Sequence, residues 1–413
     1  MASSADKMIG LRRIAAALGQ SNYRAFTIGN AVSLIGTWLQ RVAVGWLAWQ
    51  LTKSGTWLGL VAFADLFPTV VLSPLAGALA DRFDRLRIVV VTQIIAMLQA
   101  CGLAALVYAD AMTIERLFAL TVALGVANAL NQPARLALIP SLVEREHLSS
   151  AVAINSIVFN SARFLGPAAA GFAIAHGGIG VAFLVNALTY VVFLVALALI
   201  RLTPMDLAPS RRGILGDTID GYAYATRHPG IGPMLLLLAI TSLCTRAFIE
   251  LLPGFADAVF HRGAEGLAWL TAATGLGAMA GGLWMAQRPG IAGLTRLIVA
   301  NVLLISAALI GFVATDHFLV AFVCLLVAGF SLVVNGIGAQ TLVQHAAAPN
   351  MRGRVMATYG MIFRGGPAIG ALVMGTLSSQ VGLQLAVGAG AVLCALSWLW
   401  ARRLRDSMAQ ALE

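Results

Sequence analysis

Six ionisable residues stand inside long apolar stretches of the chain. They are Arg41, Asp65, Arg163, Arg246, Glu250 and Arg364. A charge at the centre of a bilayer costs roughly 3 kcal/mol or more, so each group is expected to face a water-filled cavity or an opposite charge. Carboxylates and guanidinium groups placed in this way can exchange protons and attract anions, and these are the two kinds of chemistry that the sequence offers.

Arg41 and Asp65 form the first candidate pair. Arg41 lies about eight residues before the end of its apolar stretch, and Asp65 about eight residues after the start of the next one. Because both of these ends are expected on the outer side, at about 1.5 Å per residue both groups lie ~12 Å below the same surface. Asp65 would be ionised beside Arg41, whereas alone and buried it would hold a proton. The pair is therefore either a proton-exchanging switch or a permanent lock between two helices, and both interpretations stay open.

Arg246 and Glu250 form the second candidate pair, because they are four residues apart and are expected to touch on one helix. Both are candidates for proton coupling. Glu250 also precedes Leu251-Leu252-Pro253 near the expected outer end of its stretch. It is therefore equally well read as a residue of the membrane interface.

Arg163 and Arg364 occupy corresponding positions in the two halves of the chain. The six buried ionisable residues carry four positive and two negative charges, which would attract an anionic or electron-rich molecule. The alternative is that these arginines bind helix carbonyls at an inner gate.

Trp38 could stack on a flat substrate. Polar residues that could line the same cavity, or bond between helices, are Asn30, Ser33, Gln40, Asn128, Asn131, Gln132, Asn155, Asn160, Asn335, Gln340 and Gln344.

The composition places all these residues in a helical membrane protein. Of the 413 residues, 60% are hydrophobic and 11% are charged, against about 25% charged in soluble domains. The first apolar run is longer than a signal-peptide core, so no cleaved signal is expected. Twelve membrane spans are predicted, each with room for about 20 residues. They cover 25–50, 57–80, 87–108, 113–139, 151–175, 179–200, 232–254, 264–286, 293–313, 317–343, 355–379 and 382–401.

The spans divide into two bundles of six helices, at 25–201 and 232–401. A polar linker at 202–231 joins them, and 1–24 and 402–413 form cytoplasmic ends. With both ends inside, twenty of the 27 Lys and Arg residues fall on the cytoplasmic side and three fall outside, as the positive-inside rule requires. This asymmetry accounts for most of the net charge of +10 without a nucleic-acid partner.

A repeated Gly-Pro pattern relates the two bundles. In each, an arginine precedes the pair by about a turn, and the two prolines are 200 positions apart. Small residues allow close helix approach and proline permits bending, so these positions are predicted to be packing or hinge sites. They are Gly166, Pro167 and Gly171 in the first bundle, and Gly366 and Pro367 in the second. Duplicated bundles are common in transporters, which bind substrate between the halves.

The loop between spans two and three carries a family resemblance. Its sequence, GALADRFDRLR over 77–87, resembles the signature loop of the major facilitator superfamily. The chain further resembles the bacterial branch that includes the enterobactin exporter and macrolide or multidrug efflux proteins. That likeness rests on GTWLQR over 36–41, NQPAR over 131–135 and RGRVM over 352–356. Asp84 stands where the superfamily often has glycine, and the matching loop of the second bundle has no acid.

The resemblance implies that this loop is a cytoplasmic gate. The Asp81 carboxylate would lie against the N-terminus of span eleven, where the helix dipole favours an anion. The remaining gate residues are Gly77, Arg82, Asp84, Arg85 and Arg87, whose cations could bridge to other cytoplasmic ends. The alternative is an ordinary positively charged loop.

The resemblance also implies a function. It indicates a monomeric secondary transporter of the bacterial inner membrane, driven by protons, that exports a small amphipathic siderophore-like or drug-like molecule by alternating access. An importer or lipid translocator shares these features, and a transport-inactive signalling or assembly protein is the alternative of another class. The chain has no phosphate-binding GxxxxGK[ST] loop, so ATP is not expected to drive transport. It also has no nucleophile–His–acid set, and we expect no other cofactor, no metal and no enzymatic activity.

Overall fold

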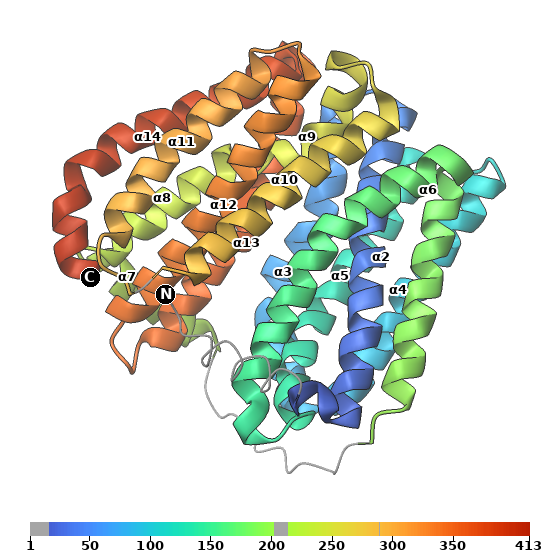
Figure 1. Ribbon diagram of the computed structural model, residues 1–413, viewed down its shortest axis with the longest axis horizontal. Coiled ribbons are helices and arrows are strands. Elements are labelled where there is room, and N and C mark those ends of the chain that lie inside the picture. The colour runs from blue at the N-terminus through green and yellow to red at the C-terminus, as the bar shows by residue number, and fades with distance from the viewer. Residues whose placement is uncertain (1–15, 202–213, 289) are drawn as a thin grey trace. The chain divides into compact units, whose positions relative to one another are not determined.

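The computed structural model describes residues 16–201, 214–288 and 290–413, and over these ranges it contains helices and no β-strand (Figure 1). Eleven helical stretches of this part of the chain are long and apolar enough to cross a membrane, which confirms the predicted all-α membrane class. The helices of the first half are α2 (Ser21–Thr52), α3 (Gly55–Arg82), α4 (Arg85–Tyr108), α5 (Ile114–Leu138), η1 (Ile139–Ser141), η2 (Arg145–His147) and α6 (Leu148–Ala198). Those of the second half are α7 (Ile214–Arg227), α8 (Ile231–Cys244), α9 (Phe248–Gly254), η3 (Phe255–Val259), α10 (Gly263–Ala286), α11 (Leu294–Val313), α12 (Phe318–Ala346), α13 (Arg352–Val381) and α14 (Leu383–Leu412).

The long helix α6 contains two of the twelve predicted spans. Its 51 residues would measure about 77 Å if straight, more than twice a bilayer core. The chain reverses at Gly178, where φ is 79° and ψ is 177°. Figure 1 shows the two arms folded back beside each other. Counting both arms turns the eleven stretches into the twelve spans expected.

Contacts with α2 show that the two arms of α6 are antiparallel. Tyr23 donates to the carbonyl of Ala151 at 2.8 Å, and Gly166 packs farther along α2 against Trp38. The first arm therefore runs in the direction of α2. The second arm runs the opposite way, because Gly29 packs on Phe193 and Ala196, whereas Gly36 packs on Asn186 and Thr189.

The described residues form two compact units. The first lies within Met1–Val44 and Val71–Ser210, and the second within Gly45–Val70 and Arg211–Glu413. Residues 45–70 join the second unit because the start of α3 packs closely on α13, as described below. The predicted division into bundles at 25–201 and 232–401 stays a prediction.

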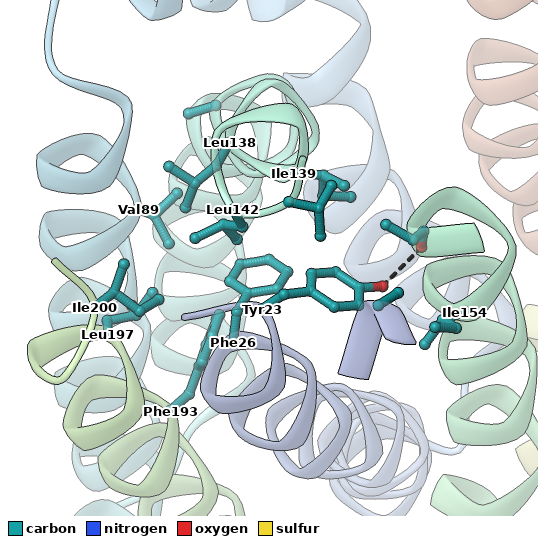
Figure 2. Packing of buried hydrophobic residues seen from close by; sticks show 14 of the residues in the cluster. Tyr23, Phe26, Val89, Leu138, Ile139, Leu142, Ile154, Phe193, Leu197 and Ile200 are labelled. Atoms are coloured by element: carbon teal, nitrogen blue, oxygen red, sulfur yellow. Dashed lines mark hydrogen bonds between the residues drawn. The ribbon is translucent and has the colours of Figure 1, made fainter. Parts of the chain in front are cut away.

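A cluster of large apolar side chains closes one end of the first unit (Figure 2). Tyr23 and Phe26 of α2 project into it, and the Phe26 and Phe193 rings meet edge to face at 5.7 Å. These aromatic side chains are at most 1% exposed, and each buried side chain of this kind contributes roughly 2 kcal/mol. The neighbours drawn with them are Val89, Leu138, Ile139, Leu142, Ile154, Leu197 and Ile200.

In the second unit, α10 and α11 both pack on α12, α14 packs on α11 and α8, and α13 packs on α8 and α7. The structure adds detail to the predicted linker and tail, whose cytoplasmic location stays a prediction. Part of the predicted linker is helix α7, while 202–213 lies outside the described residues. The residues of the predicted tail continue helix α14. Met408 and Leu412 are one helical turn apart and both are buried, and Leu412 packs against Gly230.

Carboxylates cap the corresponding helices α4 and α11. The Asp84 carboxylate accepts from the backbone N–H groups of Leu86 and Arg87 at the start of α4. The Glu413 side chain accepts at 2.6 Å from the N–H groups of Gly293 and Thr295 at the start of α11. The acid missing from the second loop is therefore supplied from the end of α14.

Glycine at the α6 reversal provides the first testable prediction. The Gly178 backbone lies in a region of positive φ that costs other residues about 1–3 kcal/mol. A Gly178→Ala variant should therefore unfold at a lower temperature, although the added Cβ would meet no atom within 4 Å. Gly360→Ala, at a helical position that is equally open, is the matched control and should be neutral or stabilising. Equal melting temperatures for the two variants would refute a conformational role for Gly178.

The Glu413 cap provides a pH prediction. Burial alone would raise the pKa of Glu413, but hydrogen bonds from Thr295 and Gly293 and the charge of Arg296 hold it below 4.5. Because the folded pKa is lowered, the stabilisation is complete above about pH 4.5 and disappears as pH falls through the lower folded value. Glu413→Gln should cost roughly 1 kcal/mol at neutral pH and nothing in strong acid. The melting temperature of each variant is measured as a function of pH, and Glu146→Gln, at an exposed position, is the control. A loss of stability in Glu413→Gln that did not change with pH would contradict the prediction.

Candidate functional site

Trp38 lies between two arginines in the first unit. The Arg41 guanidinium lies 5.6 Å from the centre of the Trp38 ring and that of Arg163 lies 5.7 Å from it, while Phe159 meets the ring edge to face at 6.0 Å. Arg41 and Trp38 come from α2, and Arg163 comes from the first arm of α6. All three side chains are half-buried. Because lipid disfavours charge, this partly open face is best suited to line an aqueous path.

Close helix packing brings these side chains together. A Cβ on Gly166 would lie 2.3 Å from the Cβ of Trp38 and 3.0 Å from the Ile35 carbonyl oxygen, so only glycine permits this approach of α6 to α2. Pro167 follows within the same helix, and Gly171 is buried one turn later. The predicted packing role of Gly166 agrees with this geometry.

Gln40 belongs to a buried amide network behind this face. Its Nε2 donates to the Gln99 Oε1 at 2.9 Å, and its Oε1 accepts from the Asn186 Nδ2 at 2.8 Å. The network joins α2, α4 and the second arm of α6. With Gln40 only 1% exposed, its side chain serves the packing of these helices rather than a surface open to substrate.

The structure differs from the expectation that Arg246 and Glu250 share one helix. The chain leaves helical geometry between α8 and α9, so Arg246 stands in a turn and Glu250 stands in α9. At the end of α8 both the backbone N–H and the hydroxyl of Thr245 donate to the carbonyl of Thr241, at 2.9 Å and 2.6 Å. The Arg246 guanidinium lies 4.1 Å from the centre of the Phe363 ring.

Glycines of α13 pack against the end of α8. A Cβ on Gly370 would lie 2.3 Å from the Leu243 carbonyl oxygen, and one on Gly366 would lie 2.6 Å from the Ser242 Cβ. Pro367 stands between them within α13, and the half-buried Arg364 stands one turn earlier. The second unit therefore repeats the arrangement of Gly166 against α2, with α8 in the place of α2.

Two asparagines that the sequence analysis assigns either to a cavity or to bonds between helices make interhelical bonds, and their role toward a substrate stays a prediction. Asn131 of α5 donates to the Thr92 hydroxyl of α4 at 2.7 Å. In the second unit, Asn335 of α12 accepts from Asn301 of α11 at 2.9 Å. Among the other predicted polar residues, Asn160 bonds to the Ser156 carbonyl of its own helix and Gln340 is exposed on α12. Asn128 and Gln132 are half-buried on α5.

Arg41 and Asp65 fall in different units, the first and the second respectively. Asp65 is half-buried on α3 and Glu250 is half-buried on α9. Their roles in proton coupling stay predictions.

The cytoplasmic motif makes local contacts within the first unit. Arg85 donates from Nε to the Ala80 carbonyl at 3.3 Å and from Nη1 to the Ala137 carbonyl at 3.1 Å, which links α3, α4 and the end of α5. Arg87 pairs with the capping Asp84 at 3.5 Å. Gly77 and Arg82 belong to α3, and the Asp81 side chain lies outside the described residues. The latch to span eleven stays a prediction.

A polar cluster that the sequence reasoning missed lies in the second unit. The Asp257 Oδ2 in η3 accepts from the Trp49 Nε1 at 2.7 Å and from the Lys53 Nζ at 2.6 Å. Neither Trp49 nor Lys53 is among the site residues that the sequence analysis predicts. An available signal was Asp257 itself, an acid at the predicted outer end of span seven close to the basic His261 and Arg262.

Small residues continue this cluster along α3 and α13. The Ser379 hydroxyl accepts from the backbone N–H of Thr56 at 3.0 Å. A Cβ on Gly59 would lie 2.3 Å from the Ala371 carbonyl oxygen, so the backbones are in close contact. A surface recess of about 610 Å³ opens beside the cluster, lined in part by Trp49 and Lys53. These contacts hold together the ends of α2, α3, η3 and α13 that the charge pattern assigns to the outside.

Comparison with known proteins agrees with this architecture. The chain is 25% identical over 352 residues to the staphyloferrin A transporter of Staphylococcus aureus (strain NCTC 8325 / PS 47), covering 84% of this chain and 87% of that protein. It is 26% identical over 365 residues to the enterobactin exporter EntS of Escherichia coli O1:K1 / APEC, covering 87% and 86% respectively.

Solved structures show the same fold at lower identity. A bacterial homologue of the human lysosomal transporter Spinster matches with a TM-score of 0.75 at 15% identity, covering 95% of this chain and 98% of that one. The nucleoside transporter NupG matches with a TM-score of 0.66 at 14% identity, covering 93% and 98%. The sequence profile of the family described as transmembrane secretion effector matches residues 14–412. The chain therefore belongs to the transmembrane secretion effector family of the major facilitator superfamily of transporters.

Proposed function

We propose that the chain exports a small, electron-rich and anionic amphipathic molecule, siderophore-like or drug-like, across the bacterial inner membrane. Export proceeds by alternating access, is driven by proton entry and is carried out by a monomer with both termini in the cytoplasm. The similarity to a staphyloferrin A transporter and an enterobactin exporter supports this substrate class.

The observation that carries the proposal is the Trp38 face of the first unit. Two guanidinium groups within 6 Å of one indole ring present positive charge beside a flat apolar surface. An aromatic anion can satisfy both, because its ring stacks on apolar surface while its charge meets Arg41 or Arg163. A lipophilic cation would be repelled by the same pair.

The cluster around Asp257 supports alternating access. The Lys53–Asp257 pair is partly exposed, with side chains 57% and 31% accessible, so it contributes roughly 1 kcal/mol or less. Hydrogen bonds such as that from Trp49 add about 1 kcal/mol each. Contacts of this strength can hold the outer ends together and still exchange for water when the transporter opens.

Proton coupling is assigned to Asp65. A carboxylate within a membrane span is expensive unless it is paired or protonated, which suits a group that binds and releases a proton during the cycle.

The substrate face is tested by transport in proteoliposomes. Arg163→Gln and Trp38→Ala should each slow efflux of labelled 2,3-dihydroxybenzoate about tenfold, because each removes an interaction of roughly 1–2 kcal/mol. Arg116→Gln, an exposed arginine in the first turn of α5, is the control and should transport normally.

Transport of other substrates would contradict the proposed role of Trp38 and Arg163 in binding an anion. If lysolipids or lipophilic cations were carried instead, and the Trp38 and Arg163 variants carried them unchanged, the arginines would be structural. A lipid translocator or a drug exporter would then replace the proposal. Uptake of the anion into the cytoplasm, measured in vesicles of defined orientation, would identify an importer.

The proton site is tested with Asp65→Asn. This variant should lose accumulation driven by a pH gradient while keeping exchange of labelled for unlabelled substrate, because an amide cannot carry a proton through the cycle. Asp110→Asn, at an exposed position outside the spans, is the matched control. Undiminished gradient-driven accumulation in Asp65→Asn would exclude Asp65 as the coupling residue.

A further inference from the structure

Arg135 has a position in the first unit that its sequence role does not explain. It was counted among the cytoplasmic cations that set the orientation of the chain. In the structure it occupies the last turn of α5 and is half-buried. Its Nη1 donates at 3.2 Å to the Oδ1 of Asn30, a residue of α2 that is only 2% exposed. The guanidinium group therefore points into the unit rather than toward bulk water.

The partner of Arg135 leaves most of its hydrogen-bonding capacity open. A guanidinium group has five N–H donors and a full positive charge, whereas an amide oxygen is a neutral acceptor. Within the part of the chain that the structure describes, the partners of Arg135 are the Asn30 amide and the nearby Tyr190 phenol, and neither is a carboxylate. A buried charge is stabilised by an opposite charge, so an anion at this position would complete the coordination of Arg135.

Asn30 aligns Arg135 with the Trp38 face. Asn30 and Arg41 are about three turns apart on α2, which puts them on the same face and separates them by roughly 16 Å along the helix axis. Arg135 is held at Asn30, and Arg163 and Arg41 are held at Trp38. The first unit therefore presents positive charge at two levels along one side of α2, with Arg135 at the level nearer the start of the helix.

We propose that Arg135, positioned by Asn30, is a second anion-binding residue that receives an acidic group of the transported molecule on the cytoplasmic side of the Trp38 face. The inference rests on the proposed function and sharpens it. The ligand carries an ionised carboxylate or phenolate, and a longer molecule with two such groups engages both levels. A neutral molecule of the same shape gains nothing from Arg135.

The experiment measures binding to the purified full chain in detergent. Isothermal titration compares 2,3-dihydroxybenzoate, which is anionic, with catechol, which is neutral. Arg135→Gln should weaken binding of the anion about tenfold or more and leave binding of catechol unchanged, because a hydrogen bond to a charged group is lost. Arg145→Gln, an exposed arginine of η2, is the matched control and should bind both probes like the parent.

A second variant separates ligand binding from helix bridging. Asn30→Asp places a carboxylate against Arg135, which should keep or raise the melting temperature of the ligand-free protein. The same carboxylate competes with the anion for Arg135, so binding of 2,3-dihydroxybenzoate should fall about tenfold. If Arg135 only bridges α2 and α5, Asn30→Asp will strengthen the bridge and leave anion binding unchanged, which would overturn the inference.

Arg163→Gln, measured with the same probes, distinguishes failure of this inference from failure of the proposed function. If it loses the anion preference while Arg135→Gln retains it, the Trp38 face binds the anion and the role of Arg135 is rejected. If the parent protein binds anion and catechol equally, both the anionic substrate class and the role of Arg135 are rejected. Loss of the preference in both variants supports two levels of anion binding.

Discussion

The cost of placing charge in a membrane governs the arrangement of this transporter. A guanidinium group cannot face lipid cheaply, so every arginine of the spans must be stabilised by the protein, by water or by a ligand. Aromatic rings serve this purpose in both units, with Trp38 beside Arg41 and Arg163, and Phe363 beside Arg246. A ring stabilises the cation through its face without occupying the N–H donors.

The aromatic contacts depend in turn on close helix packing. This packing occurs in both units, as the repeated Gly-Pro pattern predicts. Gly166 lets α6 approach α2 beside Trp38, and Gly370 lets α13 approach the end of α8. The interhelical amide bonds repeat as well, since Asn131 and Asn335 occupy corresponding helices and bond to the preceding helix in each unit. The two units thus share a packing plan and differ in the polar side chains that they carry on it.

The overall plan was predictable because it follows from patterns that extend over whole helices. Apolar length and the distribution of arginines indicate the spans, and the gap between 175 and 179 coincides with the reversal at Gly178. The break between α8 and α9 was not predictable in this way. It arises where Thr245 bonds to a carbonyl of its own chain within a segment whose composition is that of an ordinary span.

Pairwise contacts were the least predictable part of the site. Asn131 and Asn335 were recognised as polar residues inside the membrane, but the sequence did not indicate that Thr92 and Asn301 would be their partners. Arg135 lies near the end of the span predicted at 113–139, and nothing in the sequence indicates that its side chain donates to Asn30 of α2. Sequence position locates a Cα atom, and an arginine side chain can carry its charge about 6 Å farther.

The apolar cluster of the first unit and the polar cluster of the second unit differ in the free energy needed to break their contacts. The cluster of Tyr23, Phe26 and Phe193 buries large side chains worth roughly 2 kcal/mol each, together with their aliphatic neighbours. The contacts of Asp257 with Trp49 and Lys53 are polar, partly exposed and worth about 1 kcal/mol each. Water can replace the polar contacts but cannot replace the apolar ones. A conformational change should therefore leave the helix packing of the first unit intact and release residues 45–70 from η3 and α13, which is where the outward opening of the transporter would begin.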